Sequence, residues 1–164
     1  MSGQRLKLYI HMGKRLLCLL AIFLPILTFA QVREASPRTD ESVAIAKNFI
    51  QEIADMDVAL DVILSEHVIV RKPNDELYDY LEASLQEIRI NLLSKNIDEI
   101  QYKRYNELPR KEVRDIDPEG MLVENMVFLY HKNRLLTSLY IEDGKIASFT
   151  LVSKGNELAH FVTY

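Results

Sequence analysis

The segment RLLTSLYIEDGKIASFTLV at residues 134–152 determines the fold of this chain, because it predicts two strands joined by a tight turn. Its centre, Asp143-Gly144, is a strong hairpin signal, since both central residues of such a two-residue turn take positive φ. We therefore expect an antiparallel hairpin in which residues directly opposite each other share one face of the sheet. The expected pairs are Ile141 with Ile146, Leu139 with Ser148, Thr137 with Thr150 and Leu135 with Val152.

Further strands are expected on both sides of this hairpin, because apolar residues alternate with a period of two from Asp98 onward. Short turns at residues 132–133 and 154–156 separate consecutive strands. The chain should therefore end in an antiparallel meander. Its expected strands span residues 99–105, 122–130, 134–142, 145–152 and 157–163.

Both faces of this meander are largely apolar, whereas an antiparallel sheet with one free face normally alternates apolar with polar residues. One face is therefore expected to pack on helices, and the other face needs a second cover. A sheet-to-sheet homodimer is the economical cover. The expected helix-covered face carries Met126, Phe128, Tyr130, Leu139 and Ile141; the other carries Val127, Leu129 and the expected interface residues Leu136, Tyr140, Phe149 and Leu151.

The first half of the domain has helical periodicity. Apolar residues at three- and four-residue steps predict helices over residues 40–54, 58–64 and 74–95, with residues 67–70 extended. Asn74 is expected to cap the longest helix, because its side chain can accept a hydrogen bond from the first turn. Together with the meander, these helices predict an α+β fold. The apolar stripe of the longest helix is Leu77, Leu81, Leu85, Ile88 and Leu92.

The order of these elements resembles the cone-shaped α+β fold of the nuclear transport factor 2-like superfamily over about residues 40–164. The runs at residues 53–57 and 64–68 are similar to that superfamily's helix-turn-helix leading into its first strand. Cystatin-like folds, which also place a long helix against a meander, are the competing interpretation. The resemblance implies an architecture and not one function, since the superfamily hosts isomerases, hydratases, scaffolds and exported proteins.

The first thirty residues are typical of a secretory signal peptide. Four basic side chains precede an apolar run at residues 16–27, and Thr28 and Ala30 supply small residues before the expected cleavage point. The run is shorter than the roughly 20 residues of a membrane-spanning helix, and Cys18 lies too close to the basic residues for a lipoprotein cysteine. We therefore expect a signal peptide over residues 1–30, a disordered lead-in over 31–39 and one α+β domain over 40–164.

Export would change the charge of the chain. Removal of residues 1–30 takes away four basic side chains and no acidic one, so the formal net charge goes from −4 to −8. Such an acidic chain is a poor partner for nucleic acid and for anionic lipid, which both need basic side chains. Cys18, the only cysteine, leaves with the signal peptide. We expect an exported bacterial protein, periplasmic or extracellular, without disulfides and without membrane contact after cleavage.

Candidate catalytic residues are few. Glu124 interrupts an apolar sheet face, where a carboxylate has a raised pKa and can move protons; a solvated carboxylate at the strand edge is the simpler interpretation. His67 follows a helix near the mouth of the expected cone, where some members of the resembling superfamily place an acid or base; a surface or capping histidine is the simpler interpretation. His131 and His160 lack partners at ligand spacing, so no metal site and no cofactor are expected.

A binding pocket is the alternative to a catalytic site. The charged segment at residues 106–120 is long for a connection inside a domain, and such loops are often lids or binding elements. A solvated hairpin extension is its other interpretation. The expected pocket lining is Tyr102, Phe128, Tyr130, Thr137 and Thr150, at alternating positions that are also typical of plain core.

These features favour a small exported module that binds a small molecule or an envelope protein and has no catalytic activity. Two alternatives stay open. One is a cofactor-free isomerase or hydratase of the kind found in the resembling superfamily, with Glu124 or His67 as the base. The other is a structural homodimer that serves as an envelope accessory protein.

We expect exported material to begin at Gln31, because Thr28 and Ala30 match the small-residue pattern that precedes signal cleavage. Intact-mass spectrometry of protein recovered from outside the cytoplasm measures this. A mass that retains residues 16–30 would show an anchored chain and would contradict the expected localisation.

Overall fold

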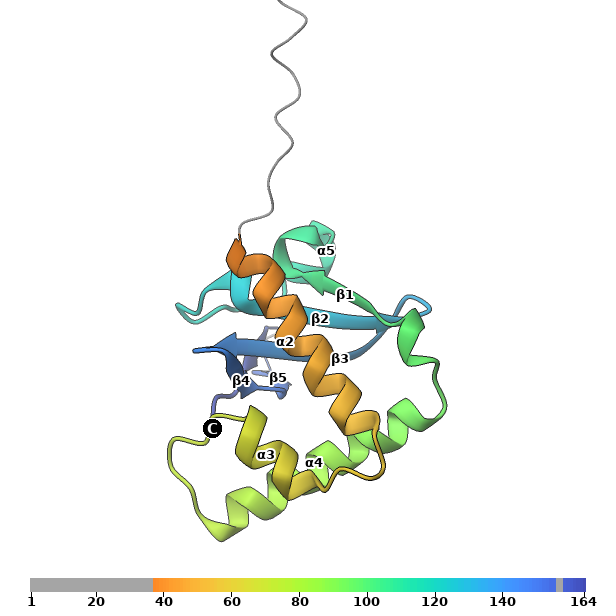
Figure 1. The fold of residues 1–164 in the computed structure, drawn as a ribbon. Helices are drawn as coiled ribbons and strands as arrows, with labels where there is room; N and C mark the ends of the chain where they lie inside the picture. Colours follow the sequence, from red (N-terminus) through yellow and green to blue (C-terminus); the bar gives the residue numbers. More distant parts are fainter. Residues whose placement is uncertain (1–36, 156–157) are drawn as a thin grey trace, which may run out of the picture. The chain divides into compact units, whose positions relative to one another are not determined.

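The computed structural model describes residues 37–155 and 158–164. In this part of the chain three helices precede the main sheet: α2 (Pro37–Ala54), α3 (Leu60–His67) and α4 (Asp75–Leu93) (Figure 1). The expected signal peptide and residues 31–36 of the expected lead-in lie outside the described residues. Residues 37–39 were expected in the lead-in but belong to α2.

The helix boundaries follow local signals in the sequence. Asn74 caps α4 as expected, since its side-chain oxygen accepts a hydrogen bond from the Leu77 N–H at 2.8 Å. The expected extended stretch at 67–70 begins one residue late, because His67 is the last residue of α3. The extended piece then runs beside the sheet, where the Ile69 N–H donates to the Ile146 carbonyl at 2.8 Å.

The strands form one antiparallel sheet of four and a separate pair. The sheet has the order β1 (Gln101–Arg104), β2 (Met126–His131), β3 (Arg134–Glu142) and β4 (Lys145–Ser148). β5 (Leu151–Ser153) pairs only with β6 (Ala159–Phe161). The α+β class with an antiparallel sheet is therefore confirmed. Short turns lie between the longer elements: η2 (Ile97–Glu99), η3 (Tyr105–Glu107), α5 (Arg110–Val113) and η4 (Val123–Asn125).

The Asp143-Gly144 turn is confirmed, with φ of 49° and 75° and with Ile141 opposite Ile146. The expected pairing beyond it is wrong, because Ser148 lies opposite Tyr140 and not Leu139. Ala147 is an extra residue on β4, which makes a β-bulge. A second bulge adds Leu136 on β3, where Leu129 pairs with Thr137. Each bulge moves the following residues to the opposite face from the one that strict alternation assigns.

β4 also ends earlier than expected. At its end the Thr150 N–H donates to the Ser148 hydroxyl, and that hydroxyl donates to the Thr150 carbonyl, each at 3.1 Å. This side-chain turn competes with ladder pairing, so the chain leaves the sheet and β5 starts a second one. The expected pairs of Thr137 with Thr150 and of Leu135 with Val152 are therefore absent.

The main core lies between the helices and one face of the sheet. The sheet contributes Val127, Leu129, Leu139, Ile141 and Ile146, and the chain after β4 contributes Phe149; the helices contribute Phe49, Ile50, Ile53, Ile63, Leu64, Leu81, Leu85 and Leu92. All of these side chains are buried, so the space between helices and sheet is filled. The expected assignment of Val127 and Leu129 to the face away from the helices is wrong, because the bulge at Leu136 reverses it.

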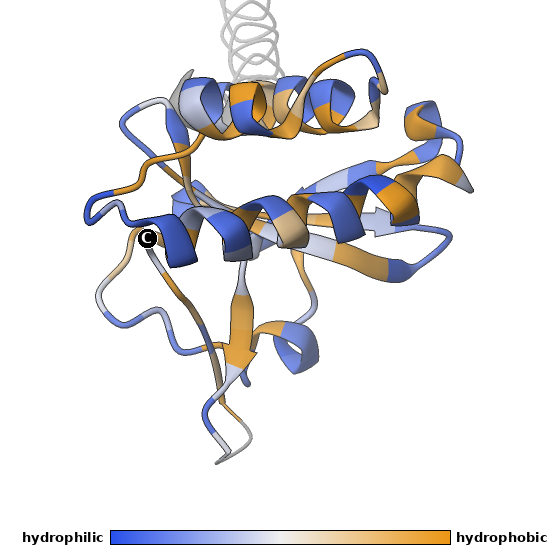
Figure 2. Ribbon diagram, turned by 90° about the horizontal axis from the view of Figure 1, so that it is seen from below, coloured by the Kyte–Doolittle hydropathy of each residue, from blue (hydrophilic) through white to orange (hydrophobic). Residues whose placement is uncertain are grey.

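The other face of the sheet is covered by the same chain. β5 and α5 lie on the side of the sheet opposite α2 (Figure 2). The buried cluster there consists of Leu108, Met126, Phe128, Tyr130, Tyr140, Ala147 and Phe161. Tyr140 and Phe149 were expected on one interface, but they lie in clusters on opposite faces, and each is only 6% exposed. An uncovered second face, the reason for expecting a dimer, is not found in the described residues.

One buried cation joins the helices. The guanidinium of Arg89 on α4 donates to the carbonyls of Ile53 and Val58 at 2.7 Å and of Asp55 at 3.1 Å. These carbonyls end α2 and form its turn into α3, where helical partners are lacking and the helix dipole favours a positive charge. The Arg89 side chain is 6% exposed, so water cannot easily replace these bonds.

Replacement of Arg89 by Met should lower the free energy of unfolding by about 2–4 kcal/mol, because a buried carbonyl left unpaired costs roughly 1–3 kcal/mol. Urea denaturation followed by circular dichroism measures this. Arg134→Met is the matched control, since Arg134 is exposed on β3, and it should stay within about 0.5 kcal/mol of the wild type. Equal stability of the two variants would contradict the role given to Arg89.

Substitution of either Phe128 or Phe149 by Glu should prevent folding, because each ring is buried inside one protomer and a carboxylate there would lose its hydration. Thermal denaturation of each variant measures this. Leu135→Glu, at a side chain 49% exposed on β3, is the control and should fold. A folded, soluble Phe149→Glu monomer from a dimeric wild type would instead support the interface expected from the sequence.

Candidate functional site

Glu124 lies at the end of the sheet in the short turn η4, and not on a strand as expected, because β2 begins only at Met126. Its half-buried side chain borders an open cleft of about 630 Å³ between the start of α2 and the β3–β4 turn. Glu41, Glu142 and Asp143 line the same cleft. The charged side chains that line this cleft are thus all acidic, and the Glu124 side chain forms no hydrogen bond with the other described residues.

Tyr140 also borders this cleft. Burial raises the pKa of its hydroxyl above the usual value, and a hydrogen bond with the Leu122 backbone partly opposes the shift. The hydroxyl therefore stays protonated at neutral pH and cannot act as a base there.

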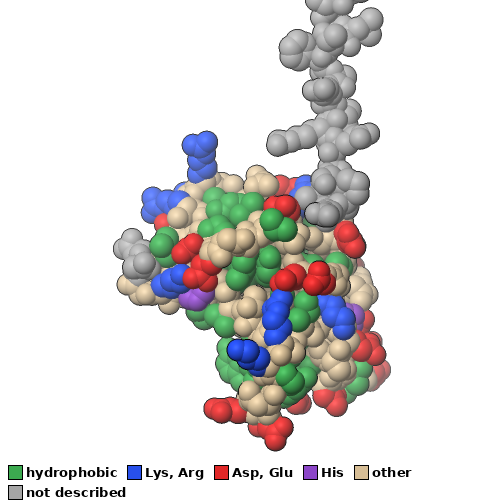
Figure 3. Space-filling model, turned by 90° about the vertical axis from the view of Figure 1, so that its left-hand side faces the viewer, with side chains coloured by type: hydrophobic (Ala, Val, Ile, Leu, Met, Phe, Trp, Pro, Cys, Tyr) green, Lys and Arg blue, Asp and Glu red, His purple; other side chains and the backbone are tan. Residues whose placement is uncertain are grey.

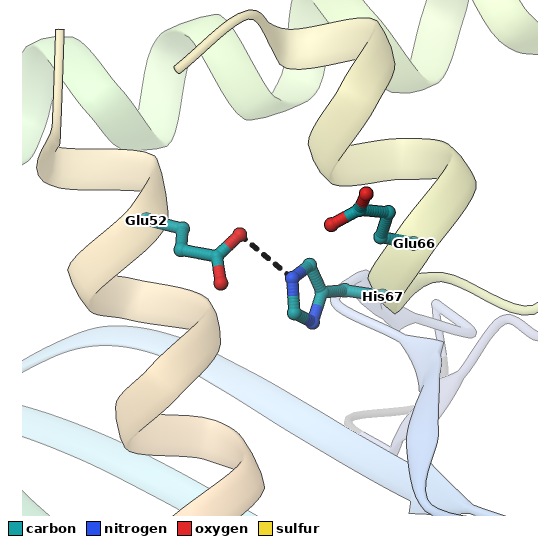
Figure 4. A group of neighbouring side chains, drawn as sticks. All are labelled: Glu52, Glu66 and His67. Carbon is teal, nitrogen blue, oxygen red and sulfur yellow. Dashed lines mark hydrogen bonds and ion pairs between the residues drawn. The ribbon is translucent and has the colours of Figure 1, made fainter. Parts of the chain in front are cut away.

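His67 lies between α2 and α3 (Figure 4). Its Nε2 is 2.7 Å from a carboxylate oxygen of Glu52 on α2. The side chain of Glu66, the preceding residue on α3, points toward this pair (Figure 4). The ring of His67 also packs beside Phe49, with 6.2 Å between ring centroids. The sequence identified His67 and interpreted Glu66 as a helix-surface charge, but it missed Glu52, which lies fifteen positions away.

A third site is a groove of about 800 Å³ between α4 and the chain around β5 and β6, which we call the α4 groove. Its apolar lining is Leu77 and Tyr80 on α4 with Val152 and Val162 on the opposite side. Tyr80 is 51% exposed, and the two valines are 37% and 36% exposed. The polar lining consists of Arg71, Lys72, Asn74, Glu76, Thr150, Thr163 and Tyr164.

Tyr164 forms the inner wall of the α4 groove. Its hydroxyl shares a hydrogen bond of 2.6 Å with the Thr150 hydroxyl and accepts one from the Phe149 N–H at 3.1 Å. Burial raises the pKa of Tyr164, against the effect of these bonds. The wall is therefore an aromatic side chain held in place, and the groove does not open into the core.

The five residues expected to line a pocket do not share one. Thr150 lines the α4 groove, whereas Tyr102 borders a small surface hollow with Lys47. Burial raises the pKa of Tyr102 to about 12. Phe128 and Tyr130 lie in the cluster on the sheet face away from the helices, and Thr137 is half-buried on β3. The Tyr130 hydroxyl donates to a Glu112 oxygen at 2.8 Å; burial, with this bond, raises the pKa of Tyr130 to about 12.

The segment at 106–120 covers the sheet and is not a free loop. Leu108 is buried, and Val113 and Ile116 pack on the same cluster as Phe128. The Asp117 N–H donates to the Ala159 carbonyl at 2.8 Å, which joins the segment to β6. The apolar residues within the charged run were the signal for this role, because they mark the side that faces the core.

Ion pairs also hold this region together. Lys154 contacts Asp117 and Glu119. Outside this region, Arg71 contacts Glu142 at 2.7 Å. The backbone N–H of Glu119 and the Lys154 ammonium together lower the pKa of Asp117. On the face shown in Figure 3, basic and acidic side chains are intermixed. That face therefore offers no single-sign field of the kind that attracts nucleic acid.

Tyr80 and Arg89 were missed from the sequence, although each had a signal. Tyr80 is an aromatic residue next to the apolar stripe of α4 and not within it, which is typical of a contact surface. Arg89 follows Leu85 by four residues and so lies within the stripe itself. A charged residue in an apolar stripe indicates a buried polar contact, but the sequence does not show its partners.

Comparison of the chain with models of known protein families, with curated proteins and with solved structures finds no match. Within the described ranges, no helix combines the length and the apolar character that crossing a membrane requires. The function must therefore be argued from the sites themselves.

Proposed function

We propose that this chain is a small exported module that binds an amphipathic small molecule in the α4 groove and has no catalytic activity. The observation that carries the proposal is the exposure of Tyr80, Val152 and Val162 on the two walls of one groove. The core beside them is filled, so these side chains are not exposed through loose packing. An apolar ligand would remove their surface from water, which stabilises the complex by about 25 cal/mol per Å².

The volume and the charge of the groove also indicate which kind of ligand it can bind. Its volume of about 800 Å³ lies in the range typical of small-molecule sites, which is roughly 300–1,000 Å³. Lys72 at its rim is exposed and forms no ion pair with the described residues, whereas the guanidinium of Arg71 is engaged by Glu142. We therefore expect a ligand with an apolar body and an anionic group that reaches Lys72.

The nuclear transport factor 2-like architecture is part of this proposal. Its support is the order of two helices, an extended piece, a long helix and an antiparallel sheet, with the helices on one face of that sheet. An interior site of the kind that the superfamily's fold would allow needs a cavity between the helices and the sheet. Here Phe49, Leu85 and Leu139 are fully buried in that space, so the ligand is placed in a groove outside it.

The two alternatives have less support. An isomerase or hydratase would need Glu124 or His67 beside an enclosed pocket, but the Glu124 cleft is open and acidic and His67 faces Glu52. A homodimer remains a prediction, although its expected interface residues lie on two different faces of the sheet: Phe149 and Leu136 pack on the helix side, and Tyr140 and Leu151 on the other. Sedimentation of the wild type at micromolar concentration tests it independently of ligand binding.

Anilinonaphthalene sulfonate (ANS) is a suitable probe of the α4 groove, since it combines aromatic rings with one anionic group. We expect saturable binding to the folded protein, and Tyr80→Glu should weaken it by about tenfold or more, equivalent to at least 1.4 kcal/mol. Ile90→Glu is the matched control, because Ile90 is an exposed apolar residue of α4 outside the groove. Fluorescence titration measures affinity, and circular dichroism checks that each variant is folded.

Lys72→Met tests the anionic contact. It should weaken ANS binding and reduce its dependence on salt, because salt screens an exposed ion pair. Equal ANS affinity of wild type, Tyr80→Glu and Ile90→Glu would show that the probe binds elsewhere and would contradict the proposed site. A folded wild type that binds no ANS would also contradict the proposed site.

A further inference from the structure

Glu52, Glu66 and His67 place three metal-ligand groups at one point on the surface between α2 and α3. One carboxylate oxygen from each glutamate and one ring nitrogen of the histidine all lie within 4.8 Å of one another. Figure 4 shows the side chains converging from the two helices. Glu52 and His67 are partly buried and already joined at 2.7 Å, so their positions are constrained, whereas Glu66 is exposed and free to adjust.

The charge of this cluster is unbalanced. Two carboxylates face one imidazole, and no Lys or Arg of the described residues forms an ion pair with either glutamate. The Glu66 side chain also makes no hydrogen bond with the described residues, although it points at the pair. Like charges at this separation repel each other, so an added positive charge between the carboxylates would stabilise the arrangement.

We propose that Glu52, Glu66 and His67 bind one divalent transition-metal ion of the zinc type. An imidazole nitrogen with carboxylate oxygens is a donor set that suits Zn²⁺, whereas Mg²⁺ and Ca²⁺ prefer oxygen ligands alone. Three protein ligands leave a coordination position for water. The sequence predicts no metal site because His131 and His160 lack partners at ligand spacing, and Glu52 lies fifteen positions from His67.

Metal binding requires a small adjustment of the pair. Zinc bonds of about 2.1 Å in a tetrahedral site place two ligand atoms about 3.4 Å apart, and the Glu52 oxygen and His67 nitrogen are now 2.7 Å apart. A change in the Glu52 side chain, which is 29% exposed, supplies this difference without moving the helices. The bound ion would link α2 to α3 and so stabilise the folded chain by mass action.

Titration of untagged, chelator-treated protein with Zn²⁺ tests the proposal. We expect one equivalent to bind by calorimetry and to raise the melting temperature, with no comparable effect of Mg²⁺. Co²⁺ in place of Zn²⁺ should give visible d–d absorption bands that report His and carboxylate ligation. Glu66→Gln should weaken the Zn²⁺ affinity by about tenfold or more, because even the loss of an outer contact to a metal ligand costs 10–100-fold.

Glu66→Gln is the decisive variant, since Glu66 is exposed and its loss should not affect folding. His131→Ala is the matched control: His131 lies 3.5 Å from Glu99, but Lys132 contacts the same carboxylate and opposes a cation there. It should bind Zn²⁺ like the wild type. The absence of saturable Zn²⁺ binding, unchanged affinity in Glu66→Gln, or loss of binding in His131→Ala would each overturn the proposal.

Discussion

The contact of Arg89 with three backbone carbonyls is the interaction on which the arrangement of the helices depends. It ties the C-terminal part of α4 to the end of α2 and to the turn into α3. Its positive charge lies at the C-terminal end of α2, where it offsets the negative end of the helix dipole. Because α2 and α3 are held at this turn, Glu52, next to Ile53 on α2, comes within hydrogen-bond distance of His67 at the end of α3.

The sheet satisfies a different constraint, since both of its faces are apolar and each needs a cover. The helices cover one face, and β5, β6 and residues 105–123 cover the other. The side-chain turn at Ser148 and Thr150 makes this arrangement possible, because it turns the chain out of the main sheet. A single chain therefore buries surface that would otherwise require a second subunit.

Because the core is filled, the candidate sites of the described chain lie on its surface. Between helices and sheet, the packing of Phe49, Leu85 and Leu139 leaves no space for a ligand. What the described chain offers instead is an apolar groove along α4, an acidic cleft beside Glu124 and a cluster of ligand groups around His67. The α4 groove and the cluster around His67 are the sites on which the two binding proposals rest.

The sequence by itself determined the features that depend on neighbouring residues. The Asp143-Gly144 turn, the positive φ of Lys132 and Asn133, the Asn74 cap and the apolar stripe of α4 each follow from local backbone preference or from helical period. These were enough to predict an α+β chain with an antiparallel sheet, because short turns allow few alternative pairings.

Only the tertiary structure decided which side of the sheet each residue faces and which side chains meet. The bulges at Leu136 and Ala147 move the residues that follow them to the opposite face of the sheet. The sequence does not reveal a bulge, because the extra residue changes the pairing of the strand and not its apolar character. Arg89 is joined to carbonyls more than thirty positions away, and Glu52 to a histidine fifteen positions away. Such contacts depend on how the helices pack, so they exist only once the whole chain has folded.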